Sequence, residues 1–199
     1  MIALRTLAKI ALLSSLASCT SVGERTLLSV GYYDIKGSSF SELDQQILLH
    51  GPTVKGVGKA LAATRIKMVP DIRFAQKGGK CFLTKTRVNV KARVTLPRLA
   101  NQRRLKKGLR RAWRNLEEYA RLHEAVHVAI ADHHALEIEK ALAAMPPADN
   151  CETLKTNARI LAAKLLEKHE LDQLKFDATE KKRIKSLTVE RTKVAELKP

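Results

Sequence analysis

The segment LHEAVHVAIADHHALEIEKALAA, residues 122–144, decides the fold because it predicts a long helix that is at least partly buried. Helix-forming residues extend back to about residue 101, with Gly108 as a break near the start, and Pro146-Pro147 ends the run. Apolar residues recur among the charged ones, which indicates a face packed against the rest of the protein. His123 and His127 are four residues apart, so a helix places their side chains on one face, about 5–6 Å apart.

These residues belong to an HExxH motif, His123-Glu124-Ala125-Val126-His127. Two imidazoles one turn apart can bind one zinc ion. Glu124 lies about 100° further round the helix, where it can accept a proton from the water that the metal activates without binding the metal itself. The alternative is a solvated face that carries two His and one Glu by chance. The apolar neighbours of the pair favour the metal site.

The third ligand has to come from outside the motif, because a catalytic zinc usually has three protein ligands and one open position. His133 lies ten residues after His123, but the helix between them contains no turn. An unbroken helix puts His133 roughly 9 Å beyond His127, too far to share its metal. Three residues on the next predicted helix are therefore the candidates: His169, Glu170 and Asp177.

The N-terminus predicts export. Arg5 and Lys9 precede a short apolar stretch, residues 10–16, that is too short to span a membrane as a helix. Cys19 follows Leu-Ala-Ser, which resembles the bacterial lipobox and implies cleavage before Cys19 and its acylation. Thr20 at the next position then implies the outer membrane. The alternative is an ordinary secretory signal with an incidental Cys.

Cys81 and Cys151 remain as an even pair once Cys19 is acylated. Exported proteins lie in an oxidising compartment, so we predict one disulfide between these two residues. It closes a loop of about 70 residues and contributes roughly 3–5 kcal/mol in the chain-entropy model. The alternative is two buried free thiols.

The remaining pattern predicts one α+β domain, with a small antiparallel sheet packed on two long helices. Residues 26–98 are strand-like around a short helix over 40–49, and residues 61–74 are expected to form a strand pair broken at Pro70-Asp71. In the alternating run from Cys81 to Leu96, one face is expected to be apolar and the other to carry cations. The apolar face comprises Phe82, Thr84, Thr86, Val88, Val90, Ala92, Val94 and Leu96, and the cations are Lys85, Arg87, Lys91 and Arg93. The second long helix is expected from about Cys151 to Leu174.

The division of the chain follows from these elements. We expect a signal peptide over residues 1–18, a single α+β domain over 19–178 and a charged tail or helix extension over 179–199. The formal net charge of +17 predicts affinity for anions, such as lipid head groups or acidic envelope polymers. Aromatic residues form only 4% of the chain, which leaves little for base stacking, and no nucleic-acid partner is expected.

The chain resembles the bacterial DUF922 family of predicted secreted zinc-dependent proteases over roughly residues 29–177. The resemblance rests on short motifs along the sequence: Tyr32-Tyr33-Asp34-Ile35-Lys36-Gly37, His50-Gly51-Pro52, Gly79-Lys80-Cys81, Thr95-Leu96-Pro97, Trp113 ten residues before the HExxH motif, and Cys151. It implies a zincin-like, metallopeptidase-type site on the first long helix. The chain departs from the family near its C-terminus, where Tyr-Asp is followed by a Thr and a His-Gly in relatives. This chain instead has Phe176-Asp177-Ala178-Thr179 at that place, and no His follows.

Two functional hypotheses result. The first is a zinc-dependent peptidase or other hydrolase, anchored in the bacterial envelope, that acts on a peptide or protein substrate in the periplasm. His123 and His127 bind zinc, and Glu124 is the general base. The second is a non-catalytic lipoprotein that binds an anionic cell-wall or lipid polymer through its basic surface. The two hypotheses differ in the role of Glu124.

Overall fold

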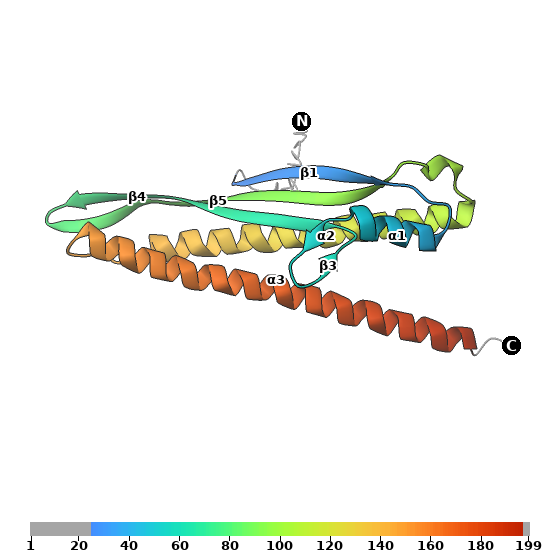
Figure 1. Ribbon diagram of the computed structural model, residues 1–199. Coiled ribbons are helices and arrows are strands. Elements are labelled where there is room, and N and C mark those ends of the chain that lie inside the picture. The colour runs from blue at the N-terminus through green and yellow to red at the C-terminus, as the bar shows by residue number, and fades with distance from the viewer. Residues whose placement is uncertain (1–24, 197–199) are drawn as a thin grey trace, which may run out of the picture.

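The computed structural model describes residues 25–196, with side chains up to residue 184, so the expected signal peptide and Cys19 lie outside the described residues. The elements follow the chain in this order: β1 (Thr26–Ile35), α1 (Phe40–His50), β2 (Thr53–Val54), β3 (Gly58–Lys59), β4 (Ala63–Lys77), β5 (Lys80–Leu99), a short 3-10 helix (Gln102–Arg104), α2 (Lys107–Ala143) and α3 (Cys151–Glu196). Figure 1 shows an elongated layer of strands lying along a hairpin of the two long helices. The predicted α+β class is confirmed.

The main sheet is mixed, which corrects the prediction of an antiparallel sheet. Its strand order is β1-β5-β4, with β4 antiparallel to β5 and β1 parallel to β5. Parallel neighbours need a long connection, and here α1, the β2–β3 hairpin and β4 supply it. Residues 63–77 form one strand rather than the expected pair. Pro70 is tolerated inside it because β4 is an edge strand, where a missing N–H need not break the ladder.

The alternation predicted for β5 holds in its second half. Val88, Val90, Ala92, Val94 and Leu96 are buried, whereas Arg87, Lys91 and Arg93 are exposed. The strand also continues through Pro97 to Leu99, whereas the expected run ended at Leu96. β4 pairs with β5 only as far as Thr95, so Pro97 lies where β1 alone is the neighbour.

The first half of β5 has the opposite facing to the prediction. Arg73 pairs with Lys85 but Phe74 pairs with Leu83, so Thr84 is an extra residue in a β-bulge. One inserted residue exchanges the two faces of a strand. Cys81 is therefore fully buried, while Phe82, which was expected on the packed face, is 36% exposed.

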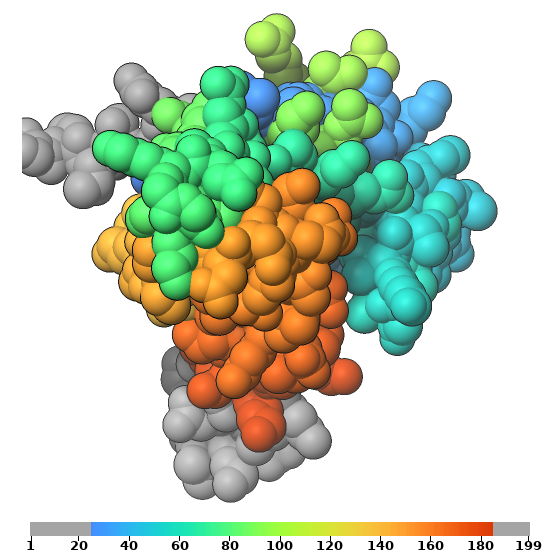
Figure 2. Space-filling model, turned by 90° about the vertical axis from the view of Figure 1, so that its left-hand side faces the viewer, coloured from blue at the N-terminus to red at the C-terminus, as the bar shows by residue number. Residues whose placement is uncertain are grey.

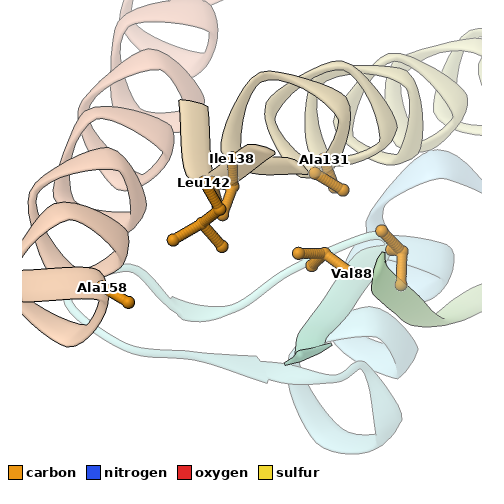
Figure 3. Packing of buried hydrophobic residues seen from close by; sticks show 7 residues of the cluster. Val88, Ala131, Ile138, Leu142 and Ala158 are labelled. Atoms are coloured by element: carbon orange, nitrogen blue, oxygen red, sulfur yellow. The ribbon is translucent and has the colours of Figure 1, made fainter. Parts of the chain in front are cut away.

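The core between the sheet and the helices is built from small and branched side chains. Val88 and Val90 of β5 pack against Ala131, Ala135, Ile138 and Leu142 of α2 and against Ala158 of α3 (Figure 3). Alanines at these positions let the α2 backbone come close to the sheet. Seen from the β4–β5 turn, the strand side chains lie on one side of the molecule and α3 on the other (Figure 2).

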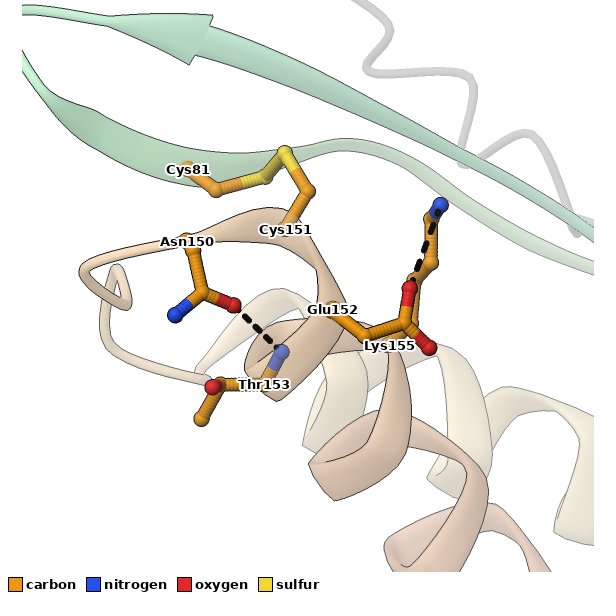
Figure 4. The surroundings of a disulfide bond; sticks show 6 residues. All are labelled: Cys81, Asn150, Cys151, Glu152, Thr153 and Lys155. Atoms are coloured by element: carbon orange, nitrogen blue, oxygen red, sulfur yellow. Dashed lines mark hydrogen bonds and ion pairs between the residues drawn. A yellow bond between two sulfur atoms is a disulfide. The ribbon is translucent and has the colours of Figure 1, made fainter.

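A disulfide joins the sheet to the second long helix. Cys81 at the start of β5 is bonded to Cys151 at the start of α3, with the two Cα atoms 5.0 Å apart (Figure 4). Asn150 caps α3, because its side-chain oxygen accepts a hydrogen bond from the Thr153 amide at 2.8 Å. The start of α3 is thus held at one end of the sheet, and the two helices run antiparallel from there.

The first long helix starts later than expected, because α2 begins at Lys107 rather than near residue 101, after the 3-10 helix. The second, α3, begins at Cys151 as expected and extends past Leu174 to Glu196. Within residues 25–196, no helix has both the length and the apolar composition needed to cross a bilayer.

Candidate metal centre

The two histidines of the motif face α3 from one side of α2. Their Nε2 atoms are 3.2 Å apart, and their side chains are 20% (His123) and 14% (His127) exposed. Two ring nitrogens at this distance cannot both present lone pairs without repulsion, so a proton or a cation has to lie between them. The i, i+4 spacing alone creates this pair, as the sequence predicts.

Asp177 of α3 completes a group of three donors. Its Oδ1 lies 3.3 Å from His123 Nε2 and 3.0 Å from His127 Nε2. All three donor atoms fall within 4.8 Å of one another. A tetrahedral zinc with ligand bonds of about 2.0–2.1 Å has neighbouring donors roughly 3.3 Å apart, so the spacing fits zinc. Of the three proposed third ligands, Asp177 is the one that the structure brings to the histidine pair.

The other two candidates lie apart from this group. His169 is buried, with 8% exposure, and its Nε2 accepts a hydrogen bond from the Gln173 amide at 2.8 Å. Burial, followed by the nearby charge of His134, lowers the pKa of His169 below its usual value. Glu170 is exposed and lines the same cavity as the histidines without joining them.

Gln173 orients His127 and was not identified from the sequence. Its Oε1 lies 2.5 Å from His127 Nδ1, and its Nε2 donates to the His127 carbonyl oxygen at 3.0 Å and to His169. An amide oxygen only accepts, so His127 carries its proton on Nδ1 and directs the Nε2 lone pair toward His123 and Asp177. Gln173 lies four residues after His169 and four before Asp177, a helical spacing that was available as a signal.

Phe176 covers the two imidazoles and was quoted from the sequence only as a departure from the family pattern. Its ring centroid lies 4.8 Å from that of His123 and 5.1 Å from that of His127. Such contacts restrict both rings to one orientation and keep water from that side of the pair. Phe176 immediately precedes Asp177, so the same turn of α3 supplies the carboxylate and the apolar cover.

Glu124 faces the sheet rather than solvent. Its side chain is 4% exposed, and one carboxylate oxygen, Oε2, accepts a hydrogen bond from the Thr64 hydroxyl of β4 at 2.7 Å. This bond fixes the carboxylate beside the histidine pair and leaves the second oxygen able to accept a proton. Thr64 gives no signal in the sequence, because only the packing of β4 on α2 brings it to the motif.

The group opens into a cavity of about 800 Å³ between β4, the β2–β3 hairpin, α2 and α3. Apolar side chains of the hairpin, β4 and α3 line it, among them Val54, Val57, Ile66, Met68 and Leu166. Polar groups line it as well, and among them the Tyr119 hydroxyl donates to Glu180 at 3.2 Å. Burial and the Glu180 charge raise the pKa of Tyr119, which keeps its hydroxyl protonated. A cavity of this size can hold a short stretch of an extended peptide.

Comparison with known proteins identifies the family of the chain. Neither curated proteins nor solved structures gave a match. The model of the DUF922 family, described as bacterial proteins of unknown function, matches residues 30–183. This range begins within β1, ends in the second half of α3 and includes every residue of the His-His-Asp group. The chain is therefore a member of the DUF922 family.

Proposed function

We propose that this protein is a metal-dependent hydrolase, with zinc as the metal and a peptide bond as the target. His123, His127 and Asp177 are the ligands, and Glu124 is the general base. The observation that supports this most is the convergence of three donor atoms beside a buried carboxylate at the wall of a large cavity. Any one of these features occurs by chance more easily than all of them together.

The metal, when bound, lowers the pKa of water at the site and polarises a substrate carbonyl. The chain's own residues prepare that chemistry. Gln173 fixes the tautomer of His127, and Phe176 restricts both imidazoles. Asp177 adds one negative charge to two neutral imidazoles, so a divalent ion keeps a net charge of about +1.

Glu124 moves the proton. Thr64 occupies one carboxylate oxygen, and the other accepts the proton from the attacking water and passes it to the leaving amine. The low exposure of the Glu124 side chain strengthens its hydrogen bond from Thr64 and its attraction for the proton of the water, because few water dipoles screen them. Ala125 and Val126, its neighbours in the motif, carry no group that could replace it.

The cavity suits a peptide better than a small metabolite. Its apolar side chains accommodate those of a peptide, and its polar groups, among them Tyr119 and Lys181, can bind backbone groups. The envelope location belongs to the same proposal: acylation at Cys19 anchors the chain in the outer membrane, facing the periplasm. The disulfide supports export, because such bonds persist in oxidising compartments.

The decisive experiment replaces Glu124 with Gln, which is nearly isosteric but cannot accept the proton. We expect Glu124→Gln to keep about one zinc per chain, by elemental analysis, and to lose turnover by at least two orders of magnitude. The matched control is Glu170→Gln, which removes an exposed carboxylate from the same cavity. Activity is assayed on casein-type proteins, peptide libraries and cell-wall peptides, with and without a chelator.

Two results would overturn the proposal. Wild-type protein that holds no metal after zinc loading would remove the metal site and the hydrolase together. A Glu124→Gln variant that complements a deletion strain as well as the wild type would remove the catalytic role, leaving the non-catalytic envelope lipoprotein as the better account.

A further inference from the structure

The outer face of the sheet carries four cations in a compact rectangle. In the register of β4 and β5, Arg65 is directly opposite Arg93 and Lys67 is directly opposite Lys91. We call these four residues the cation quartet. All four are exposed, and within residues 25–184 none of them forms an ion pair with a carboxylate. Their side chains leave the sheet about 5 Å apart across the strands and about 7 Å apart along them.

Some other cations of β5 have a carboxylate partner, although Arg73 also lies opposite Lys85, and Lys77 opposite Lys80, in the same register. Lys85, on the same face of β5, is bonded to Asp71, and Arg98 is bonded to Asp34. Like charges placed directly opposite each other weaken a strand pair. The quartet adds two such pairs side by side. The four side chains cannot turn to the other face of the sheet, because the residues that alternate with them form the core. An anionic partner on this face would remove the repulsion.

The position of the quartet identifies the partner. Lys91 is paired with Leu27 of β1, which is 64% exposed, and β1 begins at Thr26. The sequence places Cys19 six residues before Arg25, so a fully extended link reaches about 20 Å. A chain anchored at Cys19 therefore holds this end of the sheet close to the lipid surface.

The cavity lies on the opposite side of the same strand. Thr64, Ile66 and Met68 of β4 line the cavity, and they alternate with Arg65 and Lys67. Figure 1 shows the three strands on one side of the molecule and both long helices on the other. If the outer face of the sheet were bound to a membrane, the cavity would thus face away from that membrane.

We propose that the cation quartet binds the phosphate head groups of an anionic membrane and orients the protein on it. The proposal rests on the lipid anchor included in the proposed function and goes beyond the hydrolase activity. Arg65 and Arg93 can bind phosphate oxygens with two parallel hydrogen bonds, while Lys67 and Lys91 act as point charges. Each cation near an anionic surface strengthens binding about fivefold, so the quartet supplies a factor of several hundred.

The test uses the full chain with Cys19→Ser, so that acyl chains do not dominate binding. Co-sedimentation is measured with phosphatidylcholine vesicles containing no or one-third phosphatidylglycerol, at low and high salt. The test variant is Arg65→Gln/Lys67→Gln/Lys91→Gln/Arg93→Gln. The matched control removes four exposed cations from α3: Arg159→Gln, Lys164→Gln, Lys175→Gln and Lys182→Gln.

We expect the quartet variant to lose at least about a hundredfold in partitioning onto the anionic vesicles, and the α3 variant to lose less than about threefold. Equal losses would show a general effect of charge and overturn the proposal, as would equal wild-type binding to neutral vesicles. A quartet variant that binds vesicles normally but loses binding to soluble polyphosphate would also overturn it, in favour of a polymer ligand.

Stability and metal content separate this result from the hydrolase proposal. Removing opposed like charges should leave the thermal midpoint unchanged or raised, and the zinc content of the quartet variant should equal that of wild type. If the fourfold variant fails to fold, Arg65→Gln/Lys91→Gln keeps one cation on each strand and should lose about twenty-fivefold in binding. Loss of zinc binding in the motif variants leaves the vesicle result unaffected.

Discussion

Two His-His-Asp groups lie along the same interface between α2 and α3, and they differ in the direction of their lone pairs. In the motif group, both Nε2 atoms and an Asp177 oxygen converge within 4.8 Å. In the second group, His134 Nε2 lies 3.0 Å from Asp172, but His169 Nε2 is already bound to Gln173. The rings of His134 and His169 meet edge to face, with centroids 5.5 Å apart.

The comparison shows that composition alone does not bring three donor atoms together. The motif histidines come from one helix at i, i+4, so their nitrogens can point at the same position. His134 and His169 come from different helices, and their Nε2 atoms have different partners, Asp172 for His134 and Gln173 for His169. All three donors of the first group line the cavity, whereas of the second group only His169 does, and His134 is 1% exposed. We therefore assign a structural role to the second group.

The largest expected effect tests this assignment directly. His127→Ala removes one of two nitrogen ligands, so zinc content should fall from about one per chain to near zero by elemental analysis. His134→Ala, the matched change in the second group, should keep zinc and instead lower the free energy of unfolding by about 1–3 kcal/mol through lost packing. If both variants lose zinc equally, the distinction between the groups is wrong.

The two aspartates provide the next comparison. Asp177→Asn keeps the shape of the side chain but removes its charge, so zinc affinity should drop more than a hundredfold while some binding through the His pair remains. Asp172→Asn should leave the affinity within about twofold, because Asp172 contacts His134 and not the motif. Competition with a chromophoric chelator measures both. Similar values for the two variants would argue against Asp177 as a ligand.

Gln173 links the two groups, and its replacement should have a smaller effect. Gln173→Leu frees the His127 ring and its tautomer, which should weaken zinc binding about 10–100-fold. Gln173→Glu still offers an oxygen to His127 Nδ1 and should recover most of the affinity. Nitrogen chemical shifts of the His127 ring should show the proton on Nδ1 in the wild type and a mixture of tautomers in the Leu variant. An unchanged tautomer in the Leu variant would contradict the role of Gln173.

The smallest effect concerns the pH dependence of the second group. Burial lowers the pKa of His169 below 6.5, so below pH 6.5 the unfolded chain binds this proton more readily than the folded chain does. The contribution to stability is therefore complete above pH 6.5 and declines as the pH falls toward the folded-state pKa. His169→Gln in the zinc-loaded protein should flatten the stability profile between pH 6.5 and 5. A profile as steep as that of the wild type would assign the effect to another group.

Features that repeat along the chain were predictable from the sequence. The HExxH spacing predicted the histidine pair, and the alternation of β5 predicted its buried face over residues 88–96. With Cys19 set aside as the expected acylation site, the two remaining cysteines predicted the pair that the structure joins in a disulfide. Each of these three predictions depends only on the period of a helix or strand, or on simple pairing, and none of them requires the position of another element.

Features that depend on two elements were decided only by the tertiary structure. A strand shows the same alternation of side chains whether its neighbour is parallel or antiparallel, so the sequence pattern does not give the direction of β1. The bulge that exposes Phe82 depends on pairing with β4. The choice of Asp177 over His169 and Glu170 follows from how α3 lies against α2, since all three residues have helical spacing. A sequence thus determines which side chains share a face of their own element, but the packing of elements decides which faces meet, because that choice is set by long-range burial rather than by local period.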